Sequence, residues 1–69
     1  MTQDWGDVIE RVSAYVEAHP GSDAREVQLA VPTIPGATDA ALRRLERAGF
    51  IERRQGRYRS FKAYRREAA

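Results

Sequence analysis

The sequence predicts a small α+β domain, mainly helical, in which three helices are followed by a C-terminal β-hairpin. Three observations support this prediction: apolar residues at helical spacing near the start, a glycine where the third helix should stop, and two strand-like runs around a tight-turn signal. A chain of 69 residues suffices for one small domain. A domain of this size buries only about 60% of its unfolded surface, so we expect marginal stability unless the chain dimerises. Residues 1–69 are therefore assigned to a single domain.

The first helix is predicted over residues 4–19. Its apolar side chains recur at the spacing of a single helical face, namely Trp5, Val8, Ile9, Val12 and Val16. Acidic residues gather near its N-terminus, where the positive end of the helix dipole favours them. Pro20-Gly21 should end the helix.

A second, shorter helix is predicted over residues 23–31. Ser22 or Asp23 should cap it, and Glu26 follows Asp23 at the spacing of a capping box. Its inner face should consist of Val27, Ala30 and Val31.

A turn and a third helix follow. Pro32 and Pro35 cannot both continue a helix, and Ile34 between them is expected to fill the core beneath the turn. The third helix is predicted over residues 37–48, because Gly49 adopts the left-handed conformation of a helix C-cap without a steric clash. Its inward side should consist of Leu42 and Leu45, with Ala41 and Ala48 as small neighbours.

The hairpin is predicted over residues 50–61. Gln55-Gly56 is a tight-turn signal between its two strands. A two-residue turn there would pair Ile51 with Ser60. Residues 62–69 form a basic tail, for which a short helix and an unstructured segment both remain open.

The charge of the chain is strongly polarised. The net charge is +2, but residues 1–40 carry −5 and residues 41–69 carry +7. Such segregation draws a polyanion toward one side of the molecule and repels it from the other. Lys62 is the only lysine, and the planar arginine side chain suits bidentate contact with phosphate or guanine.

The residue types argue against several other classes of function. There is no cysteine, and no spacing typical of metal ligands, of a nucleophile with its base, or of a phosphate-binding glycine loop is found. We therefore expect no catalytic residues, no metal and no cofactor; His19 is interpreted as a favourable residue at the end of the first helix. No apolar run approaches a membrane span and no basic signal start is present, so the expected location is the cytoplasm without membrane association.

One motif resembles a known family. The pattern Leu-x-x-Leu-x-x-x-Gly-(Leu/Phe)-Ile, with a later glycine turn and a tyrosine, comprises Leu42, Leu45, Gly49, Phe50, Ile51, Gly56 and Tyr58. Residues 23–64 thereby resemble the winged helix-turn-helix domain of small bacterial and phage transcriptional regulators. The resemblance implies a regulator, in particular a repressor, that binds double-stranded DNA. Its third helix would lie in the major groove, and its hairpin, the wing, would contact the backbone or minor groove.

The resemblance also implies which residues face DNA. On the third helix these are Gly36, Ala37, Asp39, Ala40 and Arg43, joined on the outer face by Arg44 and Arg47, whereas Thr38 turns inward. On the wing they are Arg53, Arg54, Gln55, Arg57 and Arg59, with a solvated strand edge as the alternative interpretation. The third helix departs from the family pattern, because only Asp39 and Arg43 carry side chains that could read a base edge.

The size of the domain predicts a homodimer on a two-fold DNA site, through either the first helix or the C-terminal tail. Two other functions remain open. The first is a protein-interaction module that uses the acidic first helix with Trp5 and Tyr15. The second is non-specific binding of DNA or RNA through the arginine surface alone.

Overall fold

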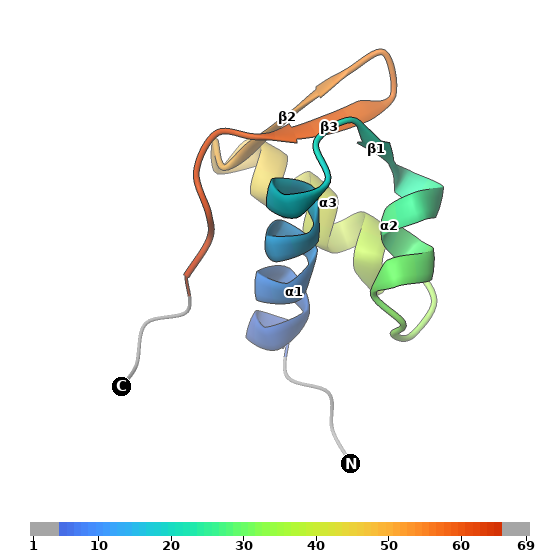
Figure 1. The fold of residues 1–69 in the computed structure, drawn as a ribbon. Coiled ribbons are helices and arrows are strands. Elements are labelled where there is room, and N and C mark those ends of the chain that lie inside the picture. The colour runs from blue at the N-terminus through green and yellow to red at the C-terminus, as the bar shows by residue number, and fades with distance from the viewer. Residues whose placement is uncertain (1–4, 66–69) are drawn as a thin grey trace.

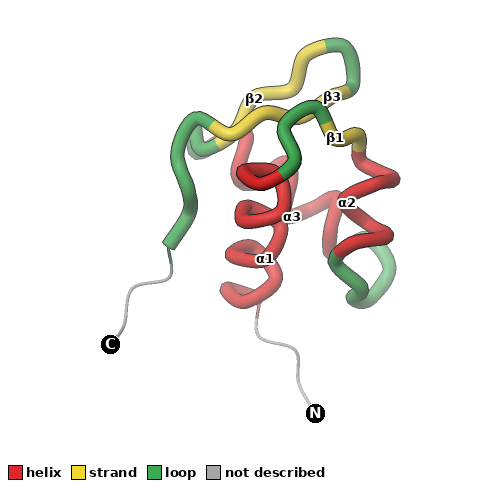
Figure 2. Tube along the Cα trace, in the orientation of Figure 1, coloured by secondary structure: helices red, strands yellow, loops and turns green. Residues whose placement is uncertain are grey.

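The computed structural model describes residues 5–65 and contains three helices and three short strands. In chain order these elements are α1 (Trp5–Ala18), β1 (Ser22–Asp23), α2 (Ala24–Ala30), α3 (Ala37–Arg47), β2 (Ile51–Arg54) and β3 (Arg57–Ser60) (Figure 1). The strands form one antiparallel sheet in the order β1-β3-β2, which lies at the C-terminal end of α1 (Figure 2). The predicted α+β, mainly helical class is confirmed, and the topology is winged-helix-like.

Helix α1 contributes the largest apolar face of the core. Its predicted stripe is buried at Val8, Ile9, Val12 and Val16. Trp5, the first residue of the same stripe, remains 36% exposed. Position 4 of the predicted helix lies outside the described residues.

Helix α2 begins with the predicted capping box. The Glu26 backbone N–H donates to Asp23 Oδ1 over 2.8 Å, and the Asp23 N–H donates to Glu26 Oε1 over 3.0 Å. Asp23 is thus the cap, whereas the Ser22 hydroxyl donates to the His19 carbonyl over 2.6 Å.

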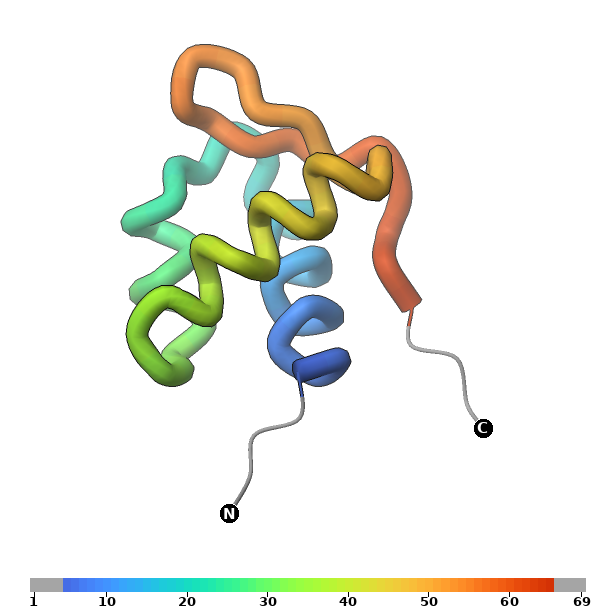
Figure 3. The backbone as a smooth tube through the Cα atoms, turned by 180° about the vertical axis from the view of Figure 1, so that it is seen from behind, coloured from blue at the N-terminus to red at the C-terminus, as the bar shows by residue number. Residues whose placement is uncertain are grey.

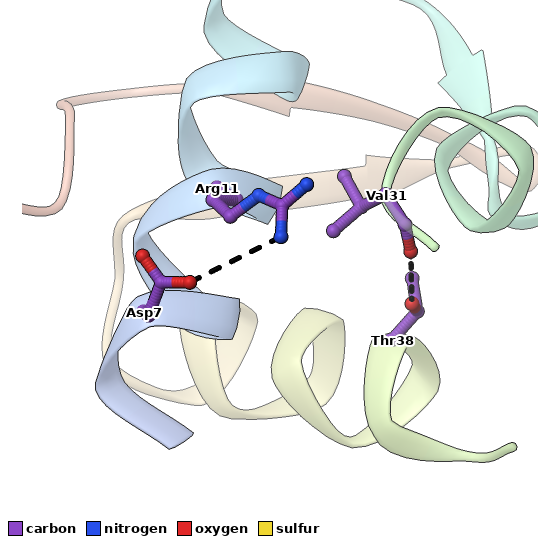
Figure 4. A network of polar contacts seen from close by, with 4 residues as sticks. All are labelled: Asp7, Arg11, Val31 and Thr38. Carbon is purple, nitrogen blue, oxygen red and sulfur yellow. Dashed lines mark hydrogen bonds and ion pairs between the residues drawn. The ribbon is translucent and has the colours of Figure 1, made fainter. Parts of the chain in front are cut away.

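Two predictions for the α2–α3 region are wrong. Ala30 is exposed, and the inner face consists of the buried Val27 and Val31 with the partly buried Ala24. Ile34 is also exposed, at 65%. The buried residues on either side of the turn are Val31 and Thr38, and the Thr38 hydroxyl donates to the Val31 carbonyl over 3.5 Å (Figure 4).

Helix α3 ends at the predicted glycine. The Gly49 N–H donates to the Glu46 carbonyl and the Phe50 N–H to the Leu45 carbonyl, which together form a Schellman motif with Gly49 at φ +86°. Ala41, Leu42 and Leu45 are buried as predicted. Ala48 is exposed, contrary to prediction, because it is the C-cap residue beyond the last buried turn.

The hairpin has the predicted register, in which Ile51 pairs with Ser60. Gln55 and Gly56 both have positive φ, at 55° and 77°, as a type I′ turn requires. Strand β1 was not predicted; its pairing of Ser22 with Tyr58 makes β3 the central strand of the sheet.

The C-terminal segment packs against the helices. Residues 62–65 form no helix, yet the Tyr64 N–H donates to the buried Ser13 Oγ over 2.9 Å. The Tyr64 ring also meets the Phe50 ring edge-on, with 5.4 Å between centroids. Neither predicted state of the tail fits these residues; residues 66–69 lie outside the described part.

Candidate nucleic-acid interface

The outer face of α3 carries three exposed arginines in one line. Ala40, Arg43, Arg44 and Arg47 follow the i, i+3, i+4, i+7 spacing of a helical face, and all are exposed. The opposite face is buried in the core. In Figure 3 α3 runs diagonally across the near side of the molecule, and its C-terminal part passes in front of α1. We call Arg43, Arg44 and Arg47 the arginine stripe.

The arginines of the stripe form no ion pair within residues 5–65, although Asp39 and Glu46 border the same hollow as Arg43. No carboxylate of this part of the chain lies within 4.0 Å of their guanidinium groups. An ion pair is found instead on α1, where Arg11 Nη1 and Asp7 Oδ2 are 4.0 Å apart (Figure 4). The stripe is therefore an open cationic surface that an anion can approach.

Trp5 joins this surface, which the sequence did not suggest. Its side chain borders a depression of about 520 Å³ together with Ala40 and the arginine stripe. The apolar pattern placed Trp5 on the core face of α1 within the acidic half of the sequence. The packing of α1 against α3 brings the indole beside the arginines. This contact could not be predicted from neighbouring residues, because Trp5 and the arginine stripe are far apart in the sequence.

The N-terminal part of α3 offers little for direct readout of bases. Ala37, the first residue of α3, is only 7% exposed and its side chain packs in the core; a role for it in DNA binding stays a prediction. Thr38 turns inward as predicted. Asp39 is half-buried, and its Oδ1 accepts a hydrogen bond from Gln28 Nε2 over 3.2 Å. Its carboxylate thus links α2 to α3.

The wing arginines do not form one surface. Strand alternation puts Arg53 on the same face of the hairpin as the buried Ile51 and Tyr58. There Arg53 borders a hollow between α3 and the wing, which is also lined by Asp39, Arg43 and Glu46. The remaining wing arginines, Arg54, Arg57 and Arg59, belong to the other face. Of the four wing arginines, Arg53 is therefore the one whose side chain extends the cationic surface of α3.

The outer face of the wing contains one unfavourable pair. Arg54 lies directly opposite Arg57, beside the exposed Gln55 at the tip, and like charges at opposed positions destabilise a hairpin. Arg57 Nη1 donates to the Gly21 carbonyl over 2.9 Å, which ties this side chain to the loop before β1. Arg59, in contrast, faces Glu52 across the strands. Within residues 5–65, Arg54 is thus the cation at the tip that has neither a hydrogen bond to the fold nor an opposed acid.

Other kinds of site find no support in the described part of the chain. Residues 5–65 contain no group of three or more histidine, cysteine or acidic side chains that could hold a metal. The Ser13 and Ser22 hydroxyls take part in hydrogen bonds that join elements of the fold, and His19 stacks on Tyr15 with 4.5 Å between the ring centroids. No described helix has the length and apolar character that crossing a membrane requires.

The winged-helix-like arrangement consists of three helices, a small sheet and a hairpin beside the third helix. The motif of residues 23–64 that resembles winged helix regulators lies on these elements, with Gly49 ending α3 and Gly56 in the hairpin turn. Comparison of the chain with protein-family models, with curated proteins and with solved structures finds no match.

Proposed function

We propose that this protein binds double-stranded DNA as a small transcriptional regulator, in particular a repressor. In this proposal α3 enters the major groove and the β2–β3 wing contacts the backbone or the minor groove. The observation that supports it best is the arginine stripe, whose three exposed guanidinium groups lie on one helical face with no ion-pair partner in residues 5–65.

The dimensions of α3 suit this role. Eleven residues form a helix about 16 Å long, and the major groove of B-DNA, about 12 Å wide, admits an α-helix. Ala40 lies in line with the arginine stripe and its side chain is small. A helix with a small residue at this position can approach the DNA closely while arginines on the same face reach phosphates or guanine.

The charge around α3 would also orient the duplex. Arg53 extends the cationic surface from α3 toward the wing, whereas Asp39 and Glu46 border the hollow between them. Phosphates are attracted by the arginines and repelled by the two carboxylates. We therefore expect the backbone of the DNA to pass over the arginine stripe and Arg53, and to avoid the side of the hollow that the two carboxylates border.

Salt-dependent binding tests this proposal. Fluorescence anisotropy would measure the affinity of the full chain for a random-sequence DNA duplex between about 50 and 200 mM salt. Each neutralised phosphate contributes about −0.9 to the log–log slope, so contacts from the arginine stripe alone predict a slope of about −3. A library selection would then identify a preferred site.

Two outcomes would overturn this assignment. Absence of binding at the lowest salt would exclude the nucleic-acid surface and favour the protein-interaction alternative through α1. Equal affinity for unrelated DNA duplexes and for an RNA duplex would replace the regulator with a non-specific nucleic-acid binder, because an A-form helix does not admit α3 into its major groove.

We also propose that two copies bind a two-fold DNA site. One helix and one wing form an interface at the low end of the range known for single DNA-binding modules, and two half-sites provide the affinity that a regulator needs. Light scattering of the protein with a selected duplex should give a mass of two chains per duplex. A mass of one chain per duplex at tens of micromolar would exclude the dimer but not DNA binding.

A further inference from the structure

We propose that a cavity beside the arginine stripe binds a small aromatic anion. This cavity, here named the aromatic pocket, has a volume of about 300 Å³ and lies between the start of α1, the end of α3 and the C-terminal segment. Its lining includes Trp5, Ile9, Arg44, Leu45, Phe50 and Tyr64. Neither the fold nor the proposed DNA interface accounts for this cavity.

The walls of the aromatic pocket are held in place. Phe50 and Tyr64 meet edge-on at 5.4 Å with an interplanar angle of 77°. The backbone of Tyr64 is anchored on Ser13 Oγ of α1, and Lys62 Nζ lies 4.9 Å from the centroid of the Phe50 ring. The floor is formed by the buried Ile9 and Leu45. The floor and the wall formed by Phe50 and Tyr64 are therefore held by contacts with several elements.

The lining chemistry indicates the class of ligand. Indole, phenyl and phenol side chains favour an aromatic ring, which can stack on them or meet them edge-on. Among the described residues that line the pocket, Arg44 is the only charged one. A guanidinium without a competing carboxylate selects an anionic group over a neutral or cationic one. A volume of about 300 Å³ lies at the lower end of ligand sites, which restricts the ligand to one or two rings.

The pocket is also connected to the proposed DNA interface. Trp5 and Arg44 line both the aromatic pocket and the depression along the arginine stripe. An anion that engages Arg44 removes one of the three stripe charges from DNA. This competition rests on the proposed DNA-binding function, whereas ligand binding itself does not.

Nitrogen-15 NMR of the full chain tests ligand binding directly. The probes are phenylacetate, its neutral analogue phenylacetamide, and acetate. Trp5 is the only tryptophan, so its indole N–H gives a single signal at the pocket. We expect phenylacetate to shift this signal and the amides of Leu45, Ala48 and Phe50 with a Kd of a few millimolar, as about ten heavy atoms allow. Phenylacetamide should bind about fivefold more weakly and acetate should cause no such shift.

Three variants distinguish binding in the aromatic pocket from binding of the probe elsewhere on the protein. Ala48→Leu adds bulk at an exposed position of the lining and should abolish the shifts without altering the core. Arg44→Gln should make phenylacetate and phenylacetamide bind equally. Arg47→Gln, which removes a charge from the stripe but not from the pocket, should retain the wild-type preference. Shifts confined to other regions, or no shift at about 20 mM phenylacetate, would overturn the proposal.

The same probe then tests the connection to DNA. Relative to an equal concentration of sodium acetate, which keeps the ionic strength the same, saturating phenylacetate should raise the Kd for a DNA duplex about two- to threefold in the wild type and cause no such difference in Arg44→Gln. NMR binding without any DNA affinity would overturn the proposed function and leave the aromatic pocket standing. Ligand binding with unchanged DNA affinity would overturn the competition.

Discussion

Helix α3 and the wing both carry exposed arginines, but they present them in opposite ways. The helical period of 3.6 residues gathers Arg43, Arg44 and Arg47 on one face. The strand period of two places Arg53 on one side of the hairpin and Arg54 on the other. The number of cations in a segment therefore says little about the surface that they form, because the secondary structure decides which of them act together.

The two regions also differ in what lies behind the charges. The arginine stripe is carried by a helix whose opposite face, with Leu42 and Leu45, is in the core. The tip of the wing extends beyond Tyr58, the buried residue of the hairpin that lies nearest to the turn. A surface supported by the core keeps its geometry, whereas the tip is held by its turn and by the contacts of Arg57 with Gly21 and β1. The following predictions test this contrast in order of decreasing effect.

The largest effect is expected from the buried face of α3. Leu42 is 1% exposed, and Leu42→Ala should lower the free energy of unfolding by about 2–5 kcal/mol through lost burial and a residual cavity. Urea denaturation followed by circular dichroism measures this change. Leu29→Ala is the matched control, because Leu29 is 74% exposed on α2 and its truncation should change stability by less than about 0.5 kcal/mol. Equal losses would show that α3 is not supported by the core.

The second effect concerns the arginine stripe. Arg43→Gln/Arg47→Gln should weaken DNA binding about tenfold at low salt and reduce the magnitude of the log–log salt slope by about 2, since two phosphate contacts are lost. Anisotropy with the same duplex measures both. Arg11→Gln removes a charge from α1, where Arg11 pairs with Asp7, and should leave the slope unchanged. A double variant with wild-type slope would exclude the arginine stripe as a phosphate-binding surface.

A smaller effect is expected from the same loss of charge on the wing. Arg54→Gln/Arg59→Gln removes two cations from the face of the hairpin that turns away from α3, and we expect about threefold weaker DNA binding. The comparison with the α3 double variant is internally matched, because each removes two arginines. If the wing variant lost as much affinity as the α3 variant, the division of the wing into two faces would be irrelevant to binding.

Local signals were sufficient to predict most of the fold. The apolar stripe of α1, the capping box at Asp23 and the glycine after α3 each depend on residues within one or two turns of each other. The hairpin register likewise follows from the two-residue turn at Gln55-Gly56. Such features are predictable because the physical cause and the residue that shows it are neighbours in the sequence.

What could not be predicted depends on distant residues. Strand β1 has two residues and exists through its pairing with Tyr58, and Tyr64 is held by Ser13, 51 positions away. Trp5 lies beside the arginine stripe only because α1 packs against α3. The candidate site was therefore predicted as a set of cations, while its aromatic border and the inward turn of Ala37 required the tertiary structure.

The smallest expected effect concerns an acid at the border of the arginine stripe. Asp39 Oδ1 accepts a hydrogen bond from Gln28 Nε2, and Asp39→Asn keeps an acceptor oxygen for Gln28 while it removes the negative charge. Phosphates near α3 would then meet less repulsion, so we expect DNA affinity to rise about two- to threefold at low salt for every duplex. Anisotropy with a random duplex and with a selected site measures this gain.

The two duplexes separate the structural role of Asp39 from base recognition. Glu17→Gln, which removes an exposed acid from α1, is the matched control and should change affinity for neither duplex. If Asp39→Asn weakened binding to the selected site alone, Asp39 would read a cytosine amino group, as an aspartate in the major groove can. The hydrogen bond to Gln28 favours a gain in affinity for both duplexes over base reading by Asp39. A carboxylate oxygen that joins α2 to α3 is turned toward the protein rather than toward the groove.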